Sequence, residues 1–146
     1  MQTFLPFPDF NKSAQVLDRM RLGKQRVETL QILQALRNET RWKNHPAVKM
    51  WKGYERALIQ YGLSICTEWI YRGYRDTCHA KISSFIERDT TQYILPPWLG
   101  SEEFHRAHRS NLLRKNYEYY SKFFSENIDL PYIWPDEVLI KNDKMI

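Results

Sequence analysis

The residues best suited to chemistry gather near the start of the chain, in a basic cluster that contains one glutamate. Four cations, Arg19, Arg21, Lys24 and Arg26, lead up to Glu28. Basic side chains hold phosphates, and a single carboxylate among them is suited to stabilising a cation or moving a proton. The alternative interpretation is a solvated helix face, on which Glu28 pairs with Lys24 one turn earlier.

A second polar cluster, Lys43, Asn44 and His45, comes directly before Pro46. Proline is favoured in the first turn of a helix, and a helix N-terminus attracts anions. His45 can donate or accept a hydrogen bond, or titrate near neutral pH. The cluster therefore predicts either an anion-binding loop or an ordinary capping loop.

Two histidines and an arginine recur at helical spacing further along the chain. His105, His108 and Arg109 are separated by three and four residues, which places them on one face of a helix. No third and fourth ligand is evident, so the pattern does not favour zinc. We expect either a basic surface that binds nucleic acid or a buried polar contact between helices.

The segment 114–122 alternates cations with Tyr117, Tyr119 and Tyr120. Cations such as Lys115 hold phosphates, while aromatic rings stack on bases or wedge between them. At helical spacing, at least one or two of these rings must point into the core. The composition favours a surface that grips a nucleic-acid strand.

The whole chain has the size and charge of one basic domain. Its 146 residues carry 22 Lys and Arg against 17 Asp and Glu, a net charge of +5, and 14% of them are aromatic. A basic, aromatic-rich surface attracts phosphates and offers bases a stacking partner. No apolar run approaches the roughly 18 residues of a membrane helix, and the N-terminus does not resemble a secretory leader. We therefore expect a cytoplasmic, monomeric protein.

Several enzyme classes have no support in the sequence. Motifs for a P-loop, a dinucleotide fold, a serine hydrolase and a zinc protease do not occur. The two cysteines, Cys66 and Cys78, have no CxxC partner and are too few for a disulfide framework. Catalysis would therefore have to use a carboxylate, a lysine, a histidine or the chain terminus itself.

The elements that must position these residues read as helices. Prolines fall at segment edges and strand-like alternation is nearly absent, so we predict an all-α single domain spanning 1–146. The first eight residues form an extended, flexible arm, and Asp9 or Asn11 caps a short helix. A longer helix over about 22–37 is expected to bury Val27, Leu30, Ile32 or Leu33, and Leu36.

Beyond a polar loop at 38–45, apolar steps of three and four predict one long helix over 46–72 that ends at Gly73. A short helix is expected at 77–86, an irregular stretch at 87–100, and a further helix at 101–116. The residues that follow are expected to form a turn or two at 117–124 and an extended, aromatic-rich tail from Ser125.

Four segments together resemble a known family. They are the LDRMRLGKQRVE run at 17–28, KNHP at 43–46, EWIYRGY at 68–74 and YEYYSK at 117–122. In this order, and in a basic chain of this size, they are similar to the pyrimidine-dimer DNA glycosylases, the small endonuclease V type enzymes first known from a phage. The resemblance runs over most of the chain.

The resemblance implies a bifunctional glycosylase and AP lyase that needs no metal or cofactor. In the family, the α-amine of the chain terminus attacks the sugar C1′, expels the damaged base and leaves an imine, and β-elimination then cuts the strand. By position, the nucleophile here is Met1 and the glutamate that assists proton transfer is Glu28. A terminal amine titrates near about 7.7–8.0, so a useful fraction is neutral at pH 7.

The implied partner is double-stranded DNA that contains a UV-type pyrimidine dimer. Other damaged or modified bases remain open as substrates, as does a non-catalytic DNA-binding module. The residues predicted to contact DNA are Arg19, Arg21, Lys24, Arg26, Lys43, Asn44, His45, Arg72, His105, His108, Arg109, Lys115, Tyr117, Tyr119 and Tyr120.

Three positions depart from the phage-type pattern. The second residue is Gln2 rather than threonine, so Met1 is expected to stay in place; its removal would leave a Gln2 terminus that can cyclise. Val27 and Arg21 stand where the phage-type enzymes have arginine and histidine, and Arg26 is offset by one residue from the first of these. The contacts to the lesion, and the lesion itself, can differ accordingly.

Overall fold

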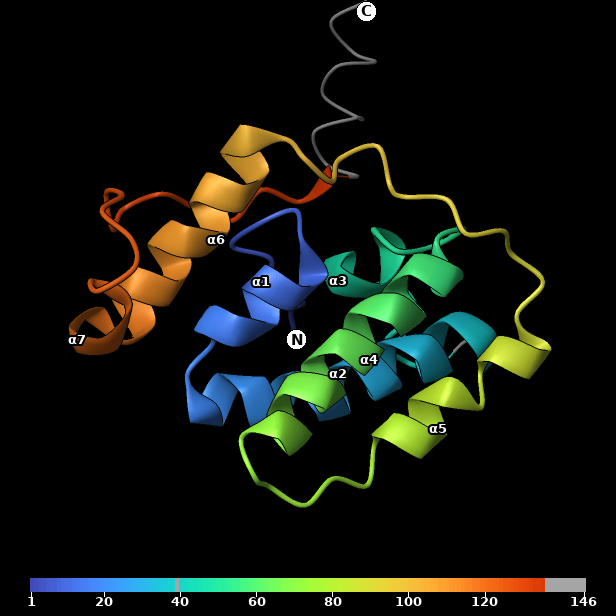
Figure 1. The fold of residues 1–146 in the computed structure, drawn as a ribbon. Helices are drawn as coiled ribbons and strands as arrows, with labels where there is room; N and C mark the ends of the chain where they lie inside the picture. Colours follow the sequence, from blue (N-terminus) through green and yellow to red (C-terminus); the bar gives the residue numbers. More distant parts are fainter. Residues whose placement is uncertain (39, 136–146) are drawn as a thin grey trace, which may run out of the picture.

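Two helices, α2 (Arg19–Asn38) and α4 (Glu55–Tyr71), lie against each other at the centre of the fold (Figure 1). The computed structural model describes residues 1–38 and 40–135. Helix α1 (Phe10–Val16) packs on α4, and α5 (His79–Ser83) packs on both central helices. No strand occurs in this described part of the chain, so the predicted all-α class is confirmed.

The buried face of α2 differs from the predicted one. Leu22, Ile32 and Leu33 are almost fully buried, whereas the side chain of Val27 is 44% exposed. The face that meets α4 also contains Thr29, which packs closely on Gly62. A Cβ atom at position 62 would lie only 2.7 Å from the Thr29 methyl group. The predicted stripe is therefore right at Ile32 and Leu33, with Leu30 and Leu36 partly buried against the core, and wrong at Val27.

The predicted long helix over 46–72 is wrong, because the structure divides it in two. A short α3 (Pro46–Lys49) is followed by a turn, and α4 begins at Glu55. Gly53 in the turn has φ +88°, a conformation that glycine adopts easily and helices exclude. Gly73, with φ +93°, follows the end of α4 as predicted.

The remaining helices follow the prediction with shorter bounds. Helix α5 and the 3₁₀ turn η1 (Ile86–Arg88) replace the short helix expected at 77–86. Helix α6 (Glu102–Lys115) and the single turn α7 (Tyr117–Tyr120) agree with the expected positions. The described part of the tail is mostly extended, and its last portion, 136–146, lies outside the described residues.

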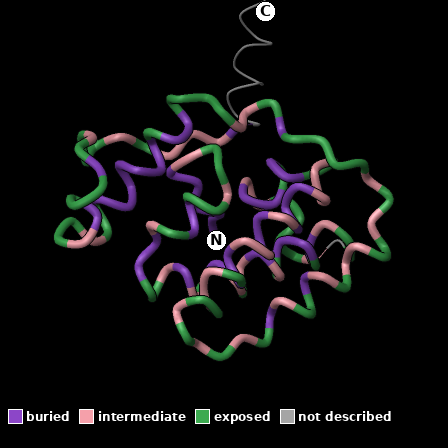
Figure 2. The backbone as a smooth tube through the Cα atoms, viewed as in Figure 1, coloured by how far each residue is buried: buried purple, intermediate pink, exposed green. Residues whose placement is uncertain are grey.

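The N-terminal arm, residues 1–8, is extended as predicted but is part of the core. Thr3 and Leu5 have no exposed surface, and the N-terminus lies at the middle of the view in Figure 1. Figure 2 shows buried backbone along α6 and along parts of the central helices. The expected flexible arm is therefore corrected to a buried one. In the described chain, no helix is long and apolar enough to cross a membrane.

Candidate active site

Two hollows meet at Glu28. The first, which we call the α2 groove, encloses about 1020 Å³ and is lined by Asp18, Arg19, Met20, Gly23, Lys24, Val27, Glu28, Gln31, Trp69 and Tyr119. The second, the arm cavity, encloses about 250 Å³ and is lined by Met1, Gln2, Phe4, Met20, Arg21, Lys24, Glu28, Lys115 and Tyr132. The structure therefore brings the two predicted catalytic residues, Met1 and Glu28, to one cavity.

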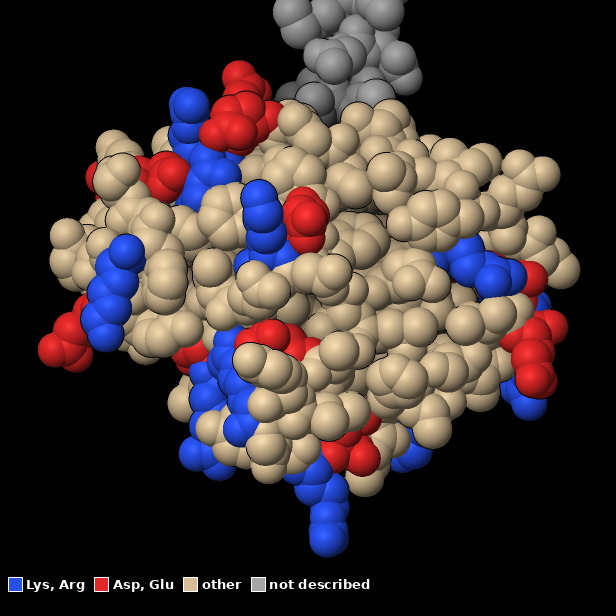
Figure 3. Space-filling view, viewed as in Figure 1, with Lys and Arg blue, Asp and Glu red and all other residues tan. Residues whose placement is uncertain are grey.

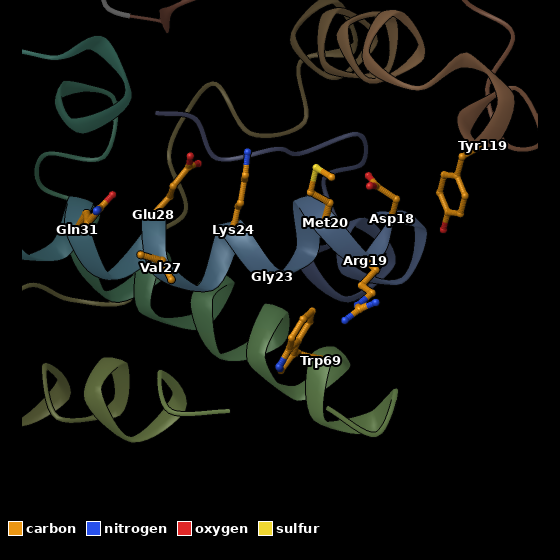
Figure 4. Close-up of a pocket in the computed structure, with 10 residues that line it drawn as sticks. All are labelled: Asp18, Arg19, Met20, Gly23, Lys24, Val27, Glu28, Gln31, Trp69 and Tyr119. Atoms are coloured by element: carbon orange, nitrogen blue, oxygen red, sulfur yellow. The ribbon is translucent and has the colours of Figure 1, made fainter. Parts of the chain in front are cut away.

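Helix α2 builds the wall of the α2 groove by its periodicity. Met20, Lys24 and Glu28 follow one another at four-residue steps, which places them along one side of the helix (Figure 4). Trp69 of α4 and Tyr119 of α7 complete the groove from other elements. The exposed Val27, unexplained by core packing, belongs to this groove as well.

The carboxylate of Glu28 is held by two N–H groups. The backbone N–H of Gln2 donates to Oε2 at 3.3 Å, and the side-chain amide of Gln25 donates to the same oxygen at 2.9 Å. Among the described residues Glu28 forms no ion pair, so the alternative pairing with Lys24 is not found. The carboxylate therefore contacts the backbone of the residue that follows Met1.

Side chains from distant helices bind the backbone of the arm. The Gln25 amide donates to Gln2 O at 2.8 Å and accepts from Phe4 N at 3.0 Å. The Tyr61 hydroxyl lies 2.8 Å from Phe4 O, and Trp51 donates to the Thr3 hydroxyl at 3.1 Å. Because an arm without helix or strand has no backbone partners of its own, these bonds are what allow it to be buried.

His105 and His108 continue this binding of the arm and are themselves fully buried. Leu5 N donates to His108 Nδ1 at 2.9 Å, and Leu5 O lies 2.8 Å from His105 Nδ1. Gly100 N donates to His105 Nε2 at 2.9 Å, so the His105 proton must lie on Nδ1 and point to Leu5 O. The predicted DNA contact has no accessible imidazole at either position, and the alternative of a buried polar contact describes both.

Burial sets the charge state of these histidines. Desolvation lowers the pKa of His108 to about 3, and it also lowers the pKa of His105. Both rings are therefore neutral at physiological pH, as the N–H groups that Leu5 donates to His108 and Gly100 donates to His105 require.

Four more predicted DNA contacts are engaged inside the protein. Arg109 donates to Pro6 O at 2.8 Å and pairs with Glu102 and Glu126. Tyr120 is fully buried and hydrogen-bonds Asp18, which ties α7 to the start of α2.

Arg26 and Arg72 are the other two. Arg26 pairs with Asp76 at 2.6 Å and lies over the Trp69 ring, 4.3 Å from its centroid. Arg72 pairs with Glu68 at 3.0 Å and donates to Gln15 O, near the end of α1. Both guanidinium groups are half-buried and paired with a carboxylate, and their predicted contacts with DNA stay predictions.

The remaining predicted contacts line a hollow or are exposed, although Arg21 is half-buried and pairs with Asp18 at 3.2 Å, as Arg26 and Arg72 pair with their carboxylates. Arg19, Arg21, Lys24 and Tyr119 line one of the two hollows, and so does Lys115. Lys43, Asn44 and Tyr117 are exposed outside both hollows. The face shown in Figure 3 has scattered Lys and Arg, several of them beside Asp or Glu, and no continuous basic patch.

His45 caps α3, and the charges of Met1 and Glu28 shift its pKa. Its Nδ1 accepts from Ala47 N at 3.0 Å, and its ring contacts those of Trp42 and Trp134 edge to face. Desolvation lowers the pKa of His45, the positive chain terminus lowers it further, and Glu28 raises it. The predicted capping loop is therefore present, within electrostatic reach of Met1 and Glu28.

Sequence reasoning missed Gln25 and Tyr61 as functional positions. Both are buried and both contact the arm from the central helices. Nothing in the local pattern distinguished Gln25 from a surface amide, because the backbone groups that it binds are distant in the sequence. No group of three or more His, Cys, Asp or Glu side chains in the described chain could hold a metal ion.

The comparisons with known proteins fall on this part of the structure. A protein-family model described as pyrimidine dimer DNA glycosylase matches residues 1–82, which contain the arm, α2, His45 and most of α5. No curated protein and no solved structure matches the chain. The matched segment covers more than half of the sequence and includes both Met1 and Glu28.

Proposed function

The chain belongs to the pyrimidine dimer DNA glycosylase family, and from that membership we propose that it excises a UV-type pyrimidine dimer and then cuts the strand at the abasic site. The family is one of enzymes that act on DNA. The finer steps, an imine on the terminal amine and a lyase reaction, are part of the proposal. We also propose that the protein acts as a cytoplasmic monomer.

The proposed reaction begins at Met1. Its neutral amine attacks C1′ of the damaged nucleotide, and the glycosidic bond breaks with its electron pair leaving on the base, which takes up the proton that the amine loses. Opening of the sugar ring gives a cationic imine, and the ring oxygen takes up a proton from water. Removal of a C2′ proton then expels the 3′ phosphate by β-elimination. Glu28 stabilises the imine cation and accepts the C2′ proton, roles that suit a carboxylate bonded to the backbone N–H of the next residue.

The cations around the two hollows supply the electrostatic part of the proposal. Arg21, Lys24 and Lys115 surround the arm cavity, while Arg19 and Tyr119 line the α2 groove. Phosphates on either side of the lesion are expected to meet these cations, which would bring the damaged sugar to Met1. The groove offers space for a base displaced from the duplex.

The observation that carries the proposal is the position of Glu28 against the arm. Its carboxylate accepts the Gln2 N–H, while Met1 lines the same cavity. A catalytic amine needs a nearby carboxylate and space for the substrate. Glu28 supplies the carboxylate, and the arm cavity beside Met1 supplies the space.

The test is strand cleavage of a duplex that contains one thymine dimer, with a matched duplex that contains an abasic site. The protein is prepared with an uncleaved N-terminal extension and again after removal of that extension. The proposal predicts cleavage of both duplexes only when the terminus is free. Equal cleavage by the extended protein would reject the terminal amine, and salt-sensitive binding without cleavage would favour a non-catalytic DNA-binding module.

A further inference from the structure

The side chain of Gln25 uses its whole amide inside the protein. Nε2 donates to Gln2 O at 2.8 Å and to Glu28 Oε2 at 2.9 Å. Oε1 accepts from Phe4 N at 3.0 Å and lies 2.7 Å from the Tyr61 hydroxyl. The residue is only 1% exposed, and each polar atom of its amide has a partner inside the protein, as a buried amide requires.

The contacts reinforce the link between the arm and the carboxylate, which also meet directly through the Gln2 N–H. One amide nitrogen holds both the carboxylate of Glu28 and the carbonyl of Gln2, the residue next to the proposed nucleophile. The oxygen of the same amide holds Phe4, two residues further along the arm. The position of the terminal segment against the carboxylate is therefore held by this planar amide together with the Gln2 N–H.

The chemistry of this position favours glutamine. The site needs two donors and an acceptor on one terminal carbon at this side-chain length, and an amide provides them. A carboxylate here would lose both donors and would place a second negative charge beside Glu28. An apolar residue would leave Gln2 O and Phe4 N buried without these partners, which destabilises the folded arm.

We infer that Gln25 is a positioning residue that fixes the N-terminal arm against Glu28 and commits Oε2 of that carboxylate to structure. The other oxygen, Oε1, has no hydrogen bond within the described chain and is left for proton transfer. This inference rests on the proposed function for its catalytic consequence. Its structural content, an arm held in register by Gln25, can be measured without DNA.

The main variant is Gln25→Glu, which keeps the shape of the side chain. Single-turnover imine formation on an abasic duplex at pH 8 is expected to fall about 100-fold, because small misplacements of reacting groups have effects of that size. Affinity for a duplex with a tetrahydrofuran site is expected to stay within about threefold, since no exposed cation changes. The rate relative to wild type should recover toward pH 5.5, where a proton shared by the two carboxyls restores one donor.

Two further variants separate positioning from stability. Gln34→Glu makes the same chemical change on an exposed part of α2 and is expected to leave the rate within about twofold of wild type. Tyr61→Phe removes one partner of Gln25 Oε1, keeps the ring, and is expected to slow imine formation by a factor of about 3 to 10. If Gln25→Glu does not fold, Tyr61→Phe provides the test of positioning in its place.

Amide hydrogen exchange tests the inference without the reaction. Gln25→Glu is expected to speed exchange at Phe4 at least about tenfold while the core amides of α4 keep their rates, which indicates local release of the arm. Equal acceleration at all amides, or a wild-type imine rate at pH 8 in a folded variant, would overturn the inference. An inactive wild-type protein with the expected exchange pattern would instead reject the proposed function and leave the structural role intact.

Discussion

Helices α2 and α6 both carry clusters of basic side chains, and the structure uses them in opposite ways. Along α2, Arg19 and Lys24 face open hollows beside Glu28. Along α6, His105, His108 and Arg109 are buried and bind the backbone of the arm. Basic clusters thus line an open groove in one helix and bind the N-terminal arm in the other.

The difference between them lies in what each helix meets. Helix α6 packs against an extended segment whose N–H and C=O groups have no ladder of their own, so donors and acceptors are needed there. The α2 groove is completed by Trp69 and Tyr119 but is not filled by an extended segment. Each prediction below changes one of these two helices.

The largest effect is expected from Glu28→Gln on α2. The variant should bind damaged duplex within a few-fold of wild type and lose strand cleavage by about 10²–10⁴, the usual contribution of a group that moves protons. Cleavage of an abasic duplex under single-turnover conditions measures it. Wild-type cleavage by the variant would remove Glu28 from the mechanism.

On α6, Arg109→Met is expected to act on stability. The change leaves Pro6 O and the half-buried Glu126 without their partner, and it should lower the free energy of unfolding by about 3 kcal/mol. Urea denaturation measures the loss. The salt dependence of DNA binding by the folded variant should stay that of wild type, and a reduced slope would place Arg109 at the DNA.

Acid should lower the free energy of unfolding through His108, which binds the arm at Leu5. Its pKa is about 3 in the folded protein, below the usual value near 6.5, so the unfolded chain binds the proton first as the pH falls. Stability from this group is complete above about pH 6.5 and is lost at up to about 1.4 kcal/mol per pH unit toward pH 3.

The variant His108→Gln cannot titrate at this position. Between pH 6.5 and 4.5, its free energy of unfolding should therefore decrease less steeply than that of wild type, by up to about 1.4 kcal/mol per pH unit. Denaturation curves at several pH values measure this slope. An unchanged slope in His108→Gln would mean that the ring does not stay neutral in the fold.

The smallest effect is expected for single cations of the α2 groove. Lys24→Ala should reduce the slope of log K against log salt by about 0.9, one phosphate contact, with a stability change within about 0.5 kcal/mol. Arg106→Ala, which removes an exposed cation from α6, is the matched control. Equal slopes for Lys24→Ala and wild type would show that the groove cations do not contact phosphates.

The sequence predicts the parts of the fold that depend on local signals. The Asp9 cap and the end of α4 at Gly73 follow from capping and turn residues, and α6 begins after Ser101 as predicted, although the Ser101 side chain makes no capping hydrogen bond. The catalytic pair was assigned by resemblance, and the structure places both residues at one cavity, while their roles stay a prediction.

The parts that sequence reasoning missed depend on contacts between distant segments. His108 binds Leu5 across 103 positions, and Tyr120 binds Asp18 across 102. Periodicity reports apolar faces, so it assigned Val27 to the core and gave no reason to bury Gln25 or Thr29. A polar side chain that is buried because it satisfies a remote backbone carries no local pattern that distinguishes it from a surface residue.

The most direct test of the account is a borohydride trap on two duplexes, one with a thymine dimer and one with an abasic site, followed by peptide mass mapping of the adduct. The account predicts a covalent adduct with both duplexes, located on the amine of Met1. An adduct on a lysine such as Lys24, or no adduct with either duplex, would contradict it.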